Sequence, residues 1–304
     1  MEPTKTIWSD GEMVPWEAAT VHVLSHALHY GTAVFEGIRA YKTPVGTAVF
    51  RLGDHMARLQ RSAAAYGIPM LWSPEQLCEA VKDLIRGNEL DDAYVRPIVF
   101  FGEGVMGLNP AGAKVRTMIA TWEWGAYLGE EGMQNGIRVA VSSWRRIDGE
   151  SLIPGAKGAG AYINSVLAKT EAIRAGVDEA LMLGSSGHVS EGSGENLFLV
   201  RDGLAFTPPP AMGALAGITR DSVMRLLADA GNEVEERIVA RSDLYAADEA
   251  FFTGTAAEVT PIREIDGRPV GDGRPAPVTR KAQEAFMAVV HGETPDLYGW
   301  LDPI

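Results

Sequence analysis

The sequence predicts an α+β fold built from two domains. Strand-like and helix-like patterns occur in both halves without strict βα alternation, which argues against a doubly wound parallel sheet. The chain has 304 residues, 46% of them hydrophobic, which is enough for a substantial core and, as a length prior, about two domains. A break rich in Gly, Glu and Asn predicts domains at 1–125 and 137–304, joined by a linker at 126–136.

The net charge of the chain favours some classes of protein over others. A net charge of −13 and a pI near 5.0 argue against a nucleic-acid partner and fit an enzyme acting on small molecules. The single cysteine, Cys78, excludes an intramolecular disulfide. Neither a signal peptide nor a run of membrane-spanning length is present, so we expect a cytoplasmic location and no membrane partner.

The first half opens with hairpin patterns. Residues 6–16 read as two strands around a turn at Asp10-Gly11, and a second hairpin joins 34–39 to 47–51. Further strands are expected at 94–101 and 114–124.

Two helices are expected between these strands. Asp54 is the predicted N-cap of a helix that ends near Tyr66. Ser73, followed by Pro74 and Gln76, forms a capping-box pattern for a helix that runs to Arg86.

The second half mixes short strands with helices bounded by glycine. We expect strands at 137–143, 179–183, 188–190, 196–201, 249–253 and 258–265, and helices at 162–175, 218–230 and 278–291.

Residues 151–165 hold one lysine, Lys157, among glycines and alanines, directly before an expected helix. Small neighbours let a flat ligand approach the backbone and leave the amine poorly hydrated. Desolvation lowers the pKa of a lysine and makes its amine a nucleophile towards carbonyls, which is the chemistry of a Schiff-base lysine. The alternative is a glycine-rich turn with an exposed lysine.

A pyridoxal phosphate site also needs an acid for the ring nitrogen and a cradle for the phosphate. Glu191 and Glu195 lie in a Gly/Ser loop and could supply the acid. Gly217-Ile218-Thr219 opens a helix whose free N–H groups attract phosphate, and the turn Gly254-Thr255-Ala256 could form an anion nest. Plain helix capping is the alternative for the first of these.

Other motifs give weaker evidence for a binding site. His22, His26 and His29 fall at helical spacing, but no carboxylate lies between them, so we expect structural histidines and no metal. Tyr94 and Arg96 share one face of a strand and suit a carboxylate, unless Pro97 marks a solvated edge strand. Arg58 could reach a phosphate or form a surface pair.

The chain resembles the branched-chain amino acid aminotransferases of the fold-type IV pyridoxal-phosphate enzymes over nearly its whole length. In the first half the resemblance is carried by His26-Ala-Leu-His-Tyr30-Gly31, Val34-Phe35-Glu36-Gly37-Ile38-Arg39, His55-Met-Ala-Arg58-Leu, Tyr94-Val-Arg96-Pro97, Met106-Gly-Leu108-Asn-Pro110 and Trp124-Gly-Ala-Tyr127-Leu128. In the second half it is carried by Lys157, Gly160-Ala-Tyr162, Ser190-Glu191-Gly-Ser-Gly-Glu195-Asn196-Leu-Phe198, Gly217-Ile-Thr219-Arg220 and Gly254-Thr255-Ala256 with Glu258.

The resemblance implies an active site at the domain interface and the cofactor pyridoxal 5'-phosphate. Lys157 would bind the cofactor through its amine and move the substrate Cα proton, while Glu191 would pair with the ring nitrogen. The other implied cofactor ligands are Arg58, Tyr162, Gly217, Ile218, Thr219, Gly254 and Thr255. The implied substrate-binding residues are Tyr30, Phe35, Gly37, Tyr94, Arg96, Met106, Leu108, Trp124, Tyr127, Thr255 and Ala256.

The resemblance implies that one pocket serves leucine, isoleucine or valine as well as glutamate, and that Arg96 would meet the distal carboxylate of glutamate. The resemblance also implies at least a homodimer, whose loop 106–108 is a candidate for lending residues to the neighbouring site. The alternatives within the fold are a D-amino acid or amine transaminase and an aminodeoxychorismate lyase. A class I aldolase, which also uses a Schiff-base lysine, is the alternative from outside it.

Overall fold

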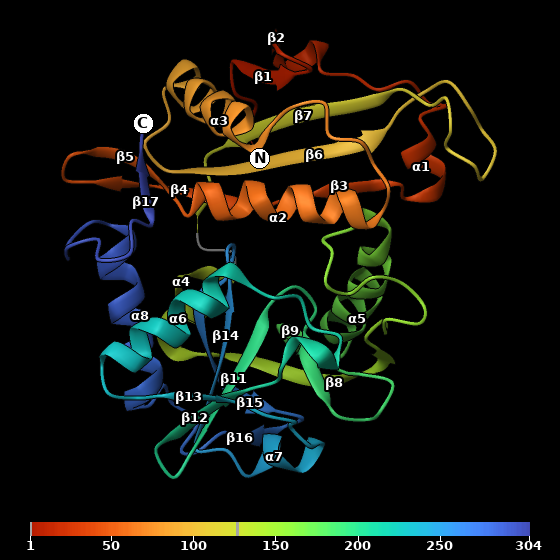
Figure 1. Ribbon diagram of the computed structural model, residues 1–304. Helices are drawn as coiled ribbons and strands as arrows, with labels where there is room; N and C mark the ends of the chain where they lie inside the picture. Colours follow the sequence, from red (N-terminus) through yellow and green to blue (C-terminus); the bar gives the residue numbers. More distant parts are fainter. Residues whose placement is uncertain (1, 126–127) are drawn as a thin grey trace. The chain divides into compact units, whose positions relative to one another are not determined.

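The computed structural model describes residues 2–125 and 128–304 (Figure 1). They group into two compact units. Unit 1 runs to Trp124 and includes Ala156–Ala161 and Val289–Ile304; unit 2 holds the described parts of Gly125–Gly155 and Tyr162–Ala288. Strands and helices occur in both units, as an α+β fold requires.

The unit boundaries differ from the expected domains in three places. Residues 156–161 belong to unit 1 because their backbone bonds to its strand residues, and the C-terminal residues belong there because the last strand pairs with an early one. Within the expected linker, Gly129–Asn135 form helix α4.

Unit 1 is organised around one antiparallel sheet. Its strands are β1 (Thr6–Ser9), β2 (Glu12–Pro15), β3 (Ala33–Phe35), β4 (Ile38–Thr43), β5 (Gly46–Phe50), β6 (Ala93–Phe101), β7 (Val115–Trp122) and β17 (Leu301–Pro303). The order is β17-β5-β4-β6-β7-β1-β2, and β3 also pairs with β6. The long strand β6 is therefore internal to the sheet.

Helices α2 (Leu52–Ala65) and α3 (Pro74–Asn88) pack on this sheet (Figure 1). Met56 and Leu59 of α2 and Leu77 and Val81 of α3 are fully buried against strand residues such as Val95. The capping box of Ser73 and Gln76 forms as predicted. The short helix α1 (His26–Tyr30) and a 3-10 turn (Trp16–Ala18) complete the unit.

Unit 2 contains a mixed sheet of order β10-β9-β8-β15-β14-β11-β12-β13, with β16 paired to β15. Its strands are β8 (Ile137–Arg145), β9 (Glu179–Leu183), β10 (Val189–Gly192), β11 (Asn196–Arg201), β12 (Leu204–Thr207), β13 (Val234–Glu236), β14 (Glu249–Gly254), β15 (Glu258–Ile265) and β16 (Arg268–Pro269). The pairs β8–β9, β8–β15 and β12–β13 are parallel.

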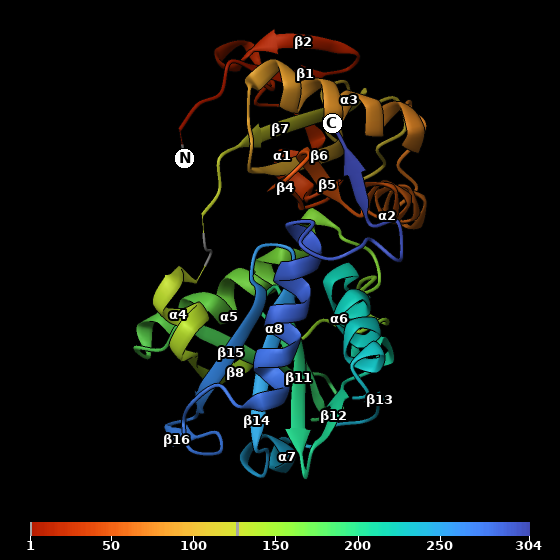
Figure 2. The same ribbon diagram turned by 90° about the vertical axis from the view of Figure 1, so that its left-hand side faces the viewer.

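Helices cover this sheet. They are α4, α5 (Tyr162–Arg174), α6 (Ile218–Asp229), α7 (Arg241–Tyr245) and α8 (Pro277–Val290), with a 3-10 turn at Pro210–Met212. The 3-10 turn at Ala159–Ala161 belongs to unit 1. Ala168 and Ala172 of α5 pack on Ala180 and Met182 of β9. Figure 2 shows α6 and α8 beside the strands β11 and β14.

The structure corrects several sequence-based boundaries. The expected strand 34–39 is split at Glu36 and Gly37. Glu36 N–H donates to the carbonyl of Pro97, and Pro97 has no N–H to return the bond, so the ladder between β6 and its neighbour is interrupted there.

The helix expected to be capped by Asp54 begins earlier. Arg51, with a left-handed φ of 53°, is the N-cap of α2, and Asp54 pairs with the Arg51 side chain at 2.6 Å. Gly87 lies inside α3, which ends at Asn88. His22 lies outside α1, so the three histidines do not share one helix.

A buried carboxylate caps the N-terminus of α8. Glu249 of β14 accepts hydrogen bonds from the backbone N–H groups of Val278 and Thr279 and from the Thr279 hydroxyl, at 2.7–3.1 Å. A negative charge is favourable at a helix N-terminus, where backbone N–H groups lack partners within the helix.

We expect Glu249→Ala to lower the free energy of unfolding by about 1–3 kcal/mol, since it leaves buried N–H groups without an acceptor. Glu249→Gln keeps one acceptor oxygen and should lose less. Urea unfolding at fixed pH measures both. An Ala variant as stable as the parent would contradict the capping role.

Candidate active site

The segment that carries Lys157 is fixed to unit 1 by its backbone. Phe35 N–H donates to the Lys157 carbonyl at 3.1 Å, and Lys157 N–H donates to the Ser62 hydroxyl at 3.0 Å. The half-buried amine lies 5.2 Å from the centroid of the Phe35 ring. Lys157 is therefore held beside an aromatic side chain and not in a freely solvated turn.

The glycines around Lys157 have a packing role in the protein itself. A Cβ on Gly158 would lie 2.6 Å from the Tyr66 ring, and Gly160 N–H donates to the Gly31 carbonyl at 3.2 Å. Small residues are needed here for the segment to approach α2 and the end of α1. Room for a flat ligand stays a prediction.

Next to this segment lies a buried cluster of Glu36, His55 and Arg58. Arg58 Nε and Nη2 donate to the two Glu36 carboxylate oxygens at 2.6 and 2.8 Å, and His55 Nδ1 lies 2.8 Å from Glu36 Oε2. Glu36 is fully buried, and the two partners are nearly so. Arg58, predicted as a phosphate ligand, thus has two nitrogens engaged by an internal carboxylate.

The cluster sets the charges of its members. Burial raises the pKa of Glu36, but the charge and hydrogen bonds of Arg58, with the hydrogen bond of His55, more than offset this, and the net pKa is well below its usual range. Burial lowers the pKa of His55 despite the nearby Glu36 carboxylate. The cluster is therefore an ionised Glu36–Arg58 pair with a neutral imidazole that donates through Nδ1.

Tyr94 and Arg96 lie side by side, as predicted from their spacing. Arg96 Nη2 donates to the Tyr94 hydroxyl at 3.1 Å, and the guanidinium carbon lies 4.8 Å from the Phe35 ring centroid and 5.2 Å from that of Tyr94. The edge-strand alternative is wrong, because β6 pairs on both sides. Among the described residues, buried Arg96 Nε has no hydrogen-bond partner.

Aromatic rings extend this group. The Trp124 ring lies 5.0 Å from the Tyr94 ring, and the Trp122 ring lies 5.1 Å from it. Gly37 follows Glu36 directly, and its N–H lies 3.3 Å from Glu36 Oε2. The predicted residues Phe35, Gly37, Tyr94, Arg96 and Trp124 thus belong to adjoining segments of unit 1.

The remaining predicted residues of unit 1 are more exposed. The Tyr30 hydroxyl donates to the Met106 carbonyl at 2.9 Å, and His26 bonds to the Gly107 carbonyl at 2.8 Å. Leu108 is 83% exposed. The predicted residue Tyr127 lies outside the described residues.

In unit 2, Glu191 of β10 has both carboxylate oxygens engaged by neighbouring donors. Arg146 Nε lies 2.8 Å from Oε1, while Asn196 Nδ2 and Leu215 N–H donate to Oε2 at 3.2 and 3.0 Å. Donors on both oxygens fix the orientation of a carboxylate. A fixed orientation is required of an acid that pairs with a single ring nitrogen.

The second candidate acid has a different environment. Burial, and then the negative charge of Glu179, raise the pKa of Glu195 to about 8. Its carboxylate accepts from Gly194 N–H at 3.0 Å. At neutral pH Glu195 is therefore mostly a neutral acid, which favours Glu191 as the residue that pairs with a cation.

The expected anion cradles occupy turns and a helix start. Gly217 is the N-cap of α6 and brings no side-chain acceptor, and Ile218 and Thr219 form the first turn. Gly254, Thr255 and Ala256 are half-buried at the β14–β15 turn, and Tyr162 is the first residue of α5. Within unit 2, the N–H groups at the start of α6 and the hydroxyl group of Thr219 are donors of the kind that suits a phosphate dianion.

Two orphaned hydroxyl groups adjoin these residues. Within the described part of the chain, the fully buried hydroxyl groups of Ser190, beside Glu191, and Thr253, beside Gly254, have no hydrogen-bond partner. Buried polar atoms in folded proteins nearly always have one. Their position fits residues that complete their hydrogen bonds with a bound molecule.

Sequence reasoning assigned no role to Glu36, His55, Arg146 or Asn196. Glu36 carries a signal, because it is a charged residue inside the apolar run Val34–Ile38. Arg146 carries none, since it follows Arg145 at the end of a strand and local sequence does not tell which of the two is buried.

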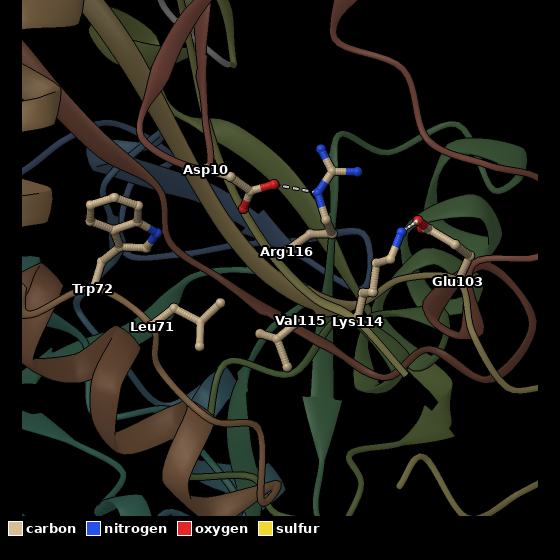
Figure 3. Close-up of a pocket in the computed structure, with 7 residues that line it drawn as sticks. All are labelled: Asp10, Leu71, Trp72, Glu103, Lys114, Val115 and Arg116. Atoms are coloured by element: carbon tan, nitrogen blue, oxygen red, sulfur yellow. Dashed lines mark hydrogen bonds and ion pairs between the residues drawn. The ribbon is translucent and has the colours of Figure 1, made fainter. Parts of the chain in front are cut away.

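A surface hollow on unit 1 is separate from the predicted site. The hollow has a volume of about 500 Å³. Its charges pair with one another, Lys114 with Glu103 and Arg116 with Asp10 (Figure 3). Its lining contains no predicted site residue; it consists of Asp10, Leu71, Trp72, Glu103, Lys114, Val115 and Arg116.

The part of the chain that the structure describes holds no cluster of three His, Cys, Asp or Glu suited to a metal, and no helix long and apolar enough to cross a membrane.

The raised pKa of Glu195 predicts a pH dependence of stability. The folded protein keeps a proton that the unfolded chain releases near pH 4.5, so the stability that this residue contributes falls as the pH rises from about 4.5 to about 8. Glu195→Gln should remove that loss, which is on the order of a few kcal/mol.

Urea unfolding at pH 5 and pH 8 tests this expectation. Glu233→Gln, at an exposed position, is the matched control and should follow the parent. Equal pH dependence in the parent and the Glu195 variant would show that Glu195 ionises normally.

Comparisons with known proteins show which family the chain is similar to. Residues 33–265 match the family model described as amino-transferase class IV. A branched-chain-amino-acid aminotransferase of Salmonella typhimurium is 51% identical over 299 residues, covering 98% of this chain and 97% of the relative.

Solved structures are similar over the same length. The branched-chain amino acid aminotransferase of Escherichia coli has a TM-score of 0.97 at 50% identity, covering 98% of this chain and 99% of that one. The T.th. branched-chain amino acid aminotransferase with pyridoxamine 5'-phosphate has a TM-score of 0.96 at 47% identity, covering 100% and 99%. The chain therefore belongs to the class IV aminotransferase family and has its fold.

Proposed function

We propose that this aminotransferase uses pyridoxal 5'-phosphate to exchange the amino group between L-leucine, L-isoleucine or L-valine and 2-oxoglutarate. The observation that carries the substrate assignment is the group Phe35–Tyr94–Arg96, in which aromatic faces surround a guanidinium whose Nε has no protein partner among the described residues. Apolar walls suit an aliphatic side chain, and the guanidinium suits the distal carboxylate of glutamate.

The donor set supports the cofactor. Arg58, Thr219 and the N–H groups at the start of α6 suit the phosphate, and Glu191 suits a ring nitrogen that carries a proton. When bound, pyridoxal phosphate supplies an electron-withdrawing ring that makes the substrate Cα proton acidic. A relative of this chain, named above, was solved with the amine form of this cofactor.

The chain's own residues carry out the proton transfer and the binding. Lys157 Nζ takes the proton from Cα of the amino-acid substrate. In the half-reaction with the 2-oxo acid, it gives a proton to Cα of the amino acid that forms. Glu191 keeps the proton on the ring nitrogen. Tyr94, with the amides of Thr255 and Ala256, holds the substrate α-carboxylate, and the aromatic side chains exclude water from the aliphatic group.

The alternatives of the same fold receive less support. A D-amino acid or amine transaminase and an aminodeoxychorismate lyase share the cofactor chemistry, so the cofactor-binding residues do not separate them from the proposed function. The relatives reported above carry the branched-chain name at about half identity over nearly the whole chain.

We also propose that the working form is at least a homodimer. The support is a group of exposed apolar side chains on unit 1, because large contiguous apolar surfaces are typical of interaction sites. These residues are Val21, Val23, Leu24, Leu28, Tyr30, Met106 and Leu108.

The first test is a visible absorption spectrum of the protein with bound cofactor. L-leucine should convert the yellow form to the colourless amine form, and 2-oxoglutarate should restore it. Lys157→Ala should stay folded and lose turnover by several orders of magnitude. A spectrum that responds to D-alanine or a simple amine, but not to L-leucine, would move the function to an alternative.

The second test separates the two substrates. Arg96→Met should reduce kcat/KM for glutamate and 2-oxoglutarate roughly 10- to 100-fold, as expected for a lost charged hydrogen bond. The values for leucine should change much less. Arg86→Met, on the exposed side of α3, is the control. Equal losses for both substrates would contradict the role of Arg96.

A further inference from the structure

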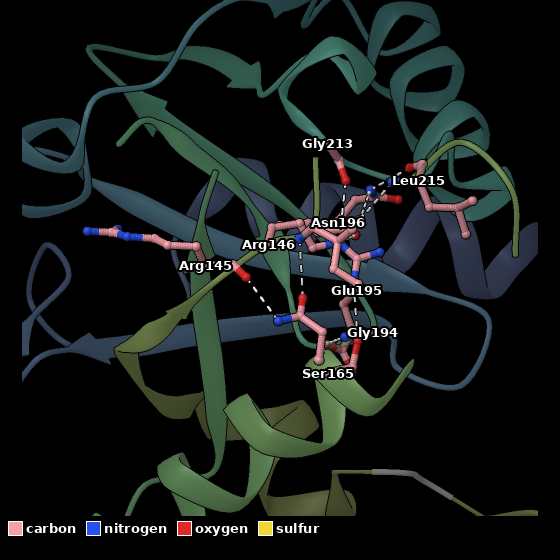
Figure 4. Close-up of polar contacts among 11 residues, drawn as sticks. Arg145, Arg146, Ser165, Gly194, Glu195, Asn196, Gly213 and Leu215 are labelled. Atoms are coloured by element: carbon pink, nitrogen blue, oxygen red, sulfur yellow. Dashed lines mark hydrogen bonds and ion pairs between the residues drawn. The ribbon is translucent and has the colours of Figure 1, made fainter. Parts of the chain in front are cut away.

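Arg146 lies at the centre of a buried network in unit 2 (Figure 4). It directly follows β8, and its backbone N–H donates to the Leu183 carbonyl of β9 at 2.8 Å. Its Nε lies 2.8 Å from Glu191 Oε1 and 3.3 Å from the Gly213 carbonyl, and its Nη1 lies 3.3 Å from the Ser165 hydroxyl of α5. The guanidinium thus connects strand β10, a loop and a helix, while the backbone N–H of the same residue bonds to β9.

Asn196 holds the other oxygen of the same carboxylate. Its Nδ2 donates to Glu191 Oε2 at 3.2 Å and to the Leu215 carbonyl at 2.9 Å. A Cβ on Gly217 would lie 1.9 Å from Asn196 Oδ1, so the amide packs directly against the N-cap of α6. The network therefore links the acid Glu191 with the start of α6.

The network is buried, which sets a strict physical requirement. The side chains of Arg146 and Glu191 are only 8% and 5% exposed. A carboxylate in such surroundings stays charged only with a paired cation and hydrogen bonds to its oxygens. Removal of the cation favours the neutral, protonated carboxyl group.

We propose that Arg146 is a positioning residue for the reaction: it keeps Glu191 ionised and fixes its carboxylate so that Glu191 can hold the proton on the cofactor's ring nitrogen. This inference rests on the proposed function, in which Glu191 pairs with that nitrogen. A neutral Glu191 carboxyl group stabilises a protonated ring nitrogen much less than a carboxylate does, so the nitrogen loses its proton and the ring withdraws electrons less strongly.

The proposal differs from a structural role in what it predicts. An arginine that only anchors the loop through Gly213 would affect folding and leave the protonation of the ring nitrogen unchanged. An arginine that sets the charge of Glu191 changes that protonation even where the variant folds and binds cofactor fully.

The experiment measures the ring nitrogen directly. The full-length protein is loaded with pyridoxal phosphate labelled with ¹⁵N in the ring, and the ¹⁵N chemical shift reports whether the nitrogen carries a proton. The variants are Arg146→Met, Arg146→Lys, Glu191→Gln and the double variant. Arg145→Met is the matched control, because Arg145 is the neighbouring exposed arginine (Figure 4).

We expect the protonated shift in the parent, in the control and in Arg146→Lys, which keeps the charge. We expect the unprotonated shift in Arg146→Met and Glu191→Gln. Arg146→Met should also lower kcat at least about tenfold with KM changed less than about threefold, the pattern of a lost proton-transfer contribution. The double variant should be no slower than the slower single variant, because both changes remove one function.

Two results overturn the proposal in different ways. A protonated shift in Arg146→Met together with an unprotonated one in Glu191→Gln leaves Arg146 as a structural anchor. A protonated shift in Glu191→Gln overturns the assigned role of Glu191, and the inference with it. If Arg146→Met does not fold, Arg146→Lys and the double variant decide, and loss of protonation in Arg146→Lys contradicts the charge argument.

Discussion

The burial of ionised carboxylates is the constraint on which the candidate site depends. A carboxylate removed from water keeps its charge only beside a cation and several hydrogen-bond donors. Unit 1 meets this requirement with Arg58 and His55 around Glu36, and unit 2 meets it with Arg146, Asn196 and a backbone amide around Glu191. Each arrangement fixes side chains that the proposed chemistry needs in a single direction.

The same constraint shapes the fold near Lys157. Glu36 lies between the end of β3 and the start of β4. The preceding residue, Phe35, donates its backbone N–H to the Lys157 carbonyl. Ser62, one turn beyond Arg58 on α2, holds Lys157 from the other side. The lysine and the buried ion pair are therefore supported by the same strand and helix, so a change that disturbs the pair also disturbs the lysine.

Much of the secondary structure could be predicted because its signals are local. The Asp10-Gly11 turn, the capping box at Ser73 and the glycine after α5 depend only on neighbouring residues. Predictions failed where a distant partner decided the outcome. Arg51 and not Asp54 is the N-cap of α2, and the Arg51 N–H donates to the carbonyl of Trp300, almost 250 residues away in the chain.

The sequence by itself determined the α+β class, the family and the adjacency of Tyr94 and Arg96, because periodicity and ordered motifs are properties of neighbouring residues. Only the tertiary structure decided that residues 156–161 pack with unit 1, that β6 is internal, and that Arg146 and not Arg145 is the buried partner of Glu191. These outcomes depend on contacts between residues far apart in the chain, and burial at such contacts, not residue type, determines which charges must be paired.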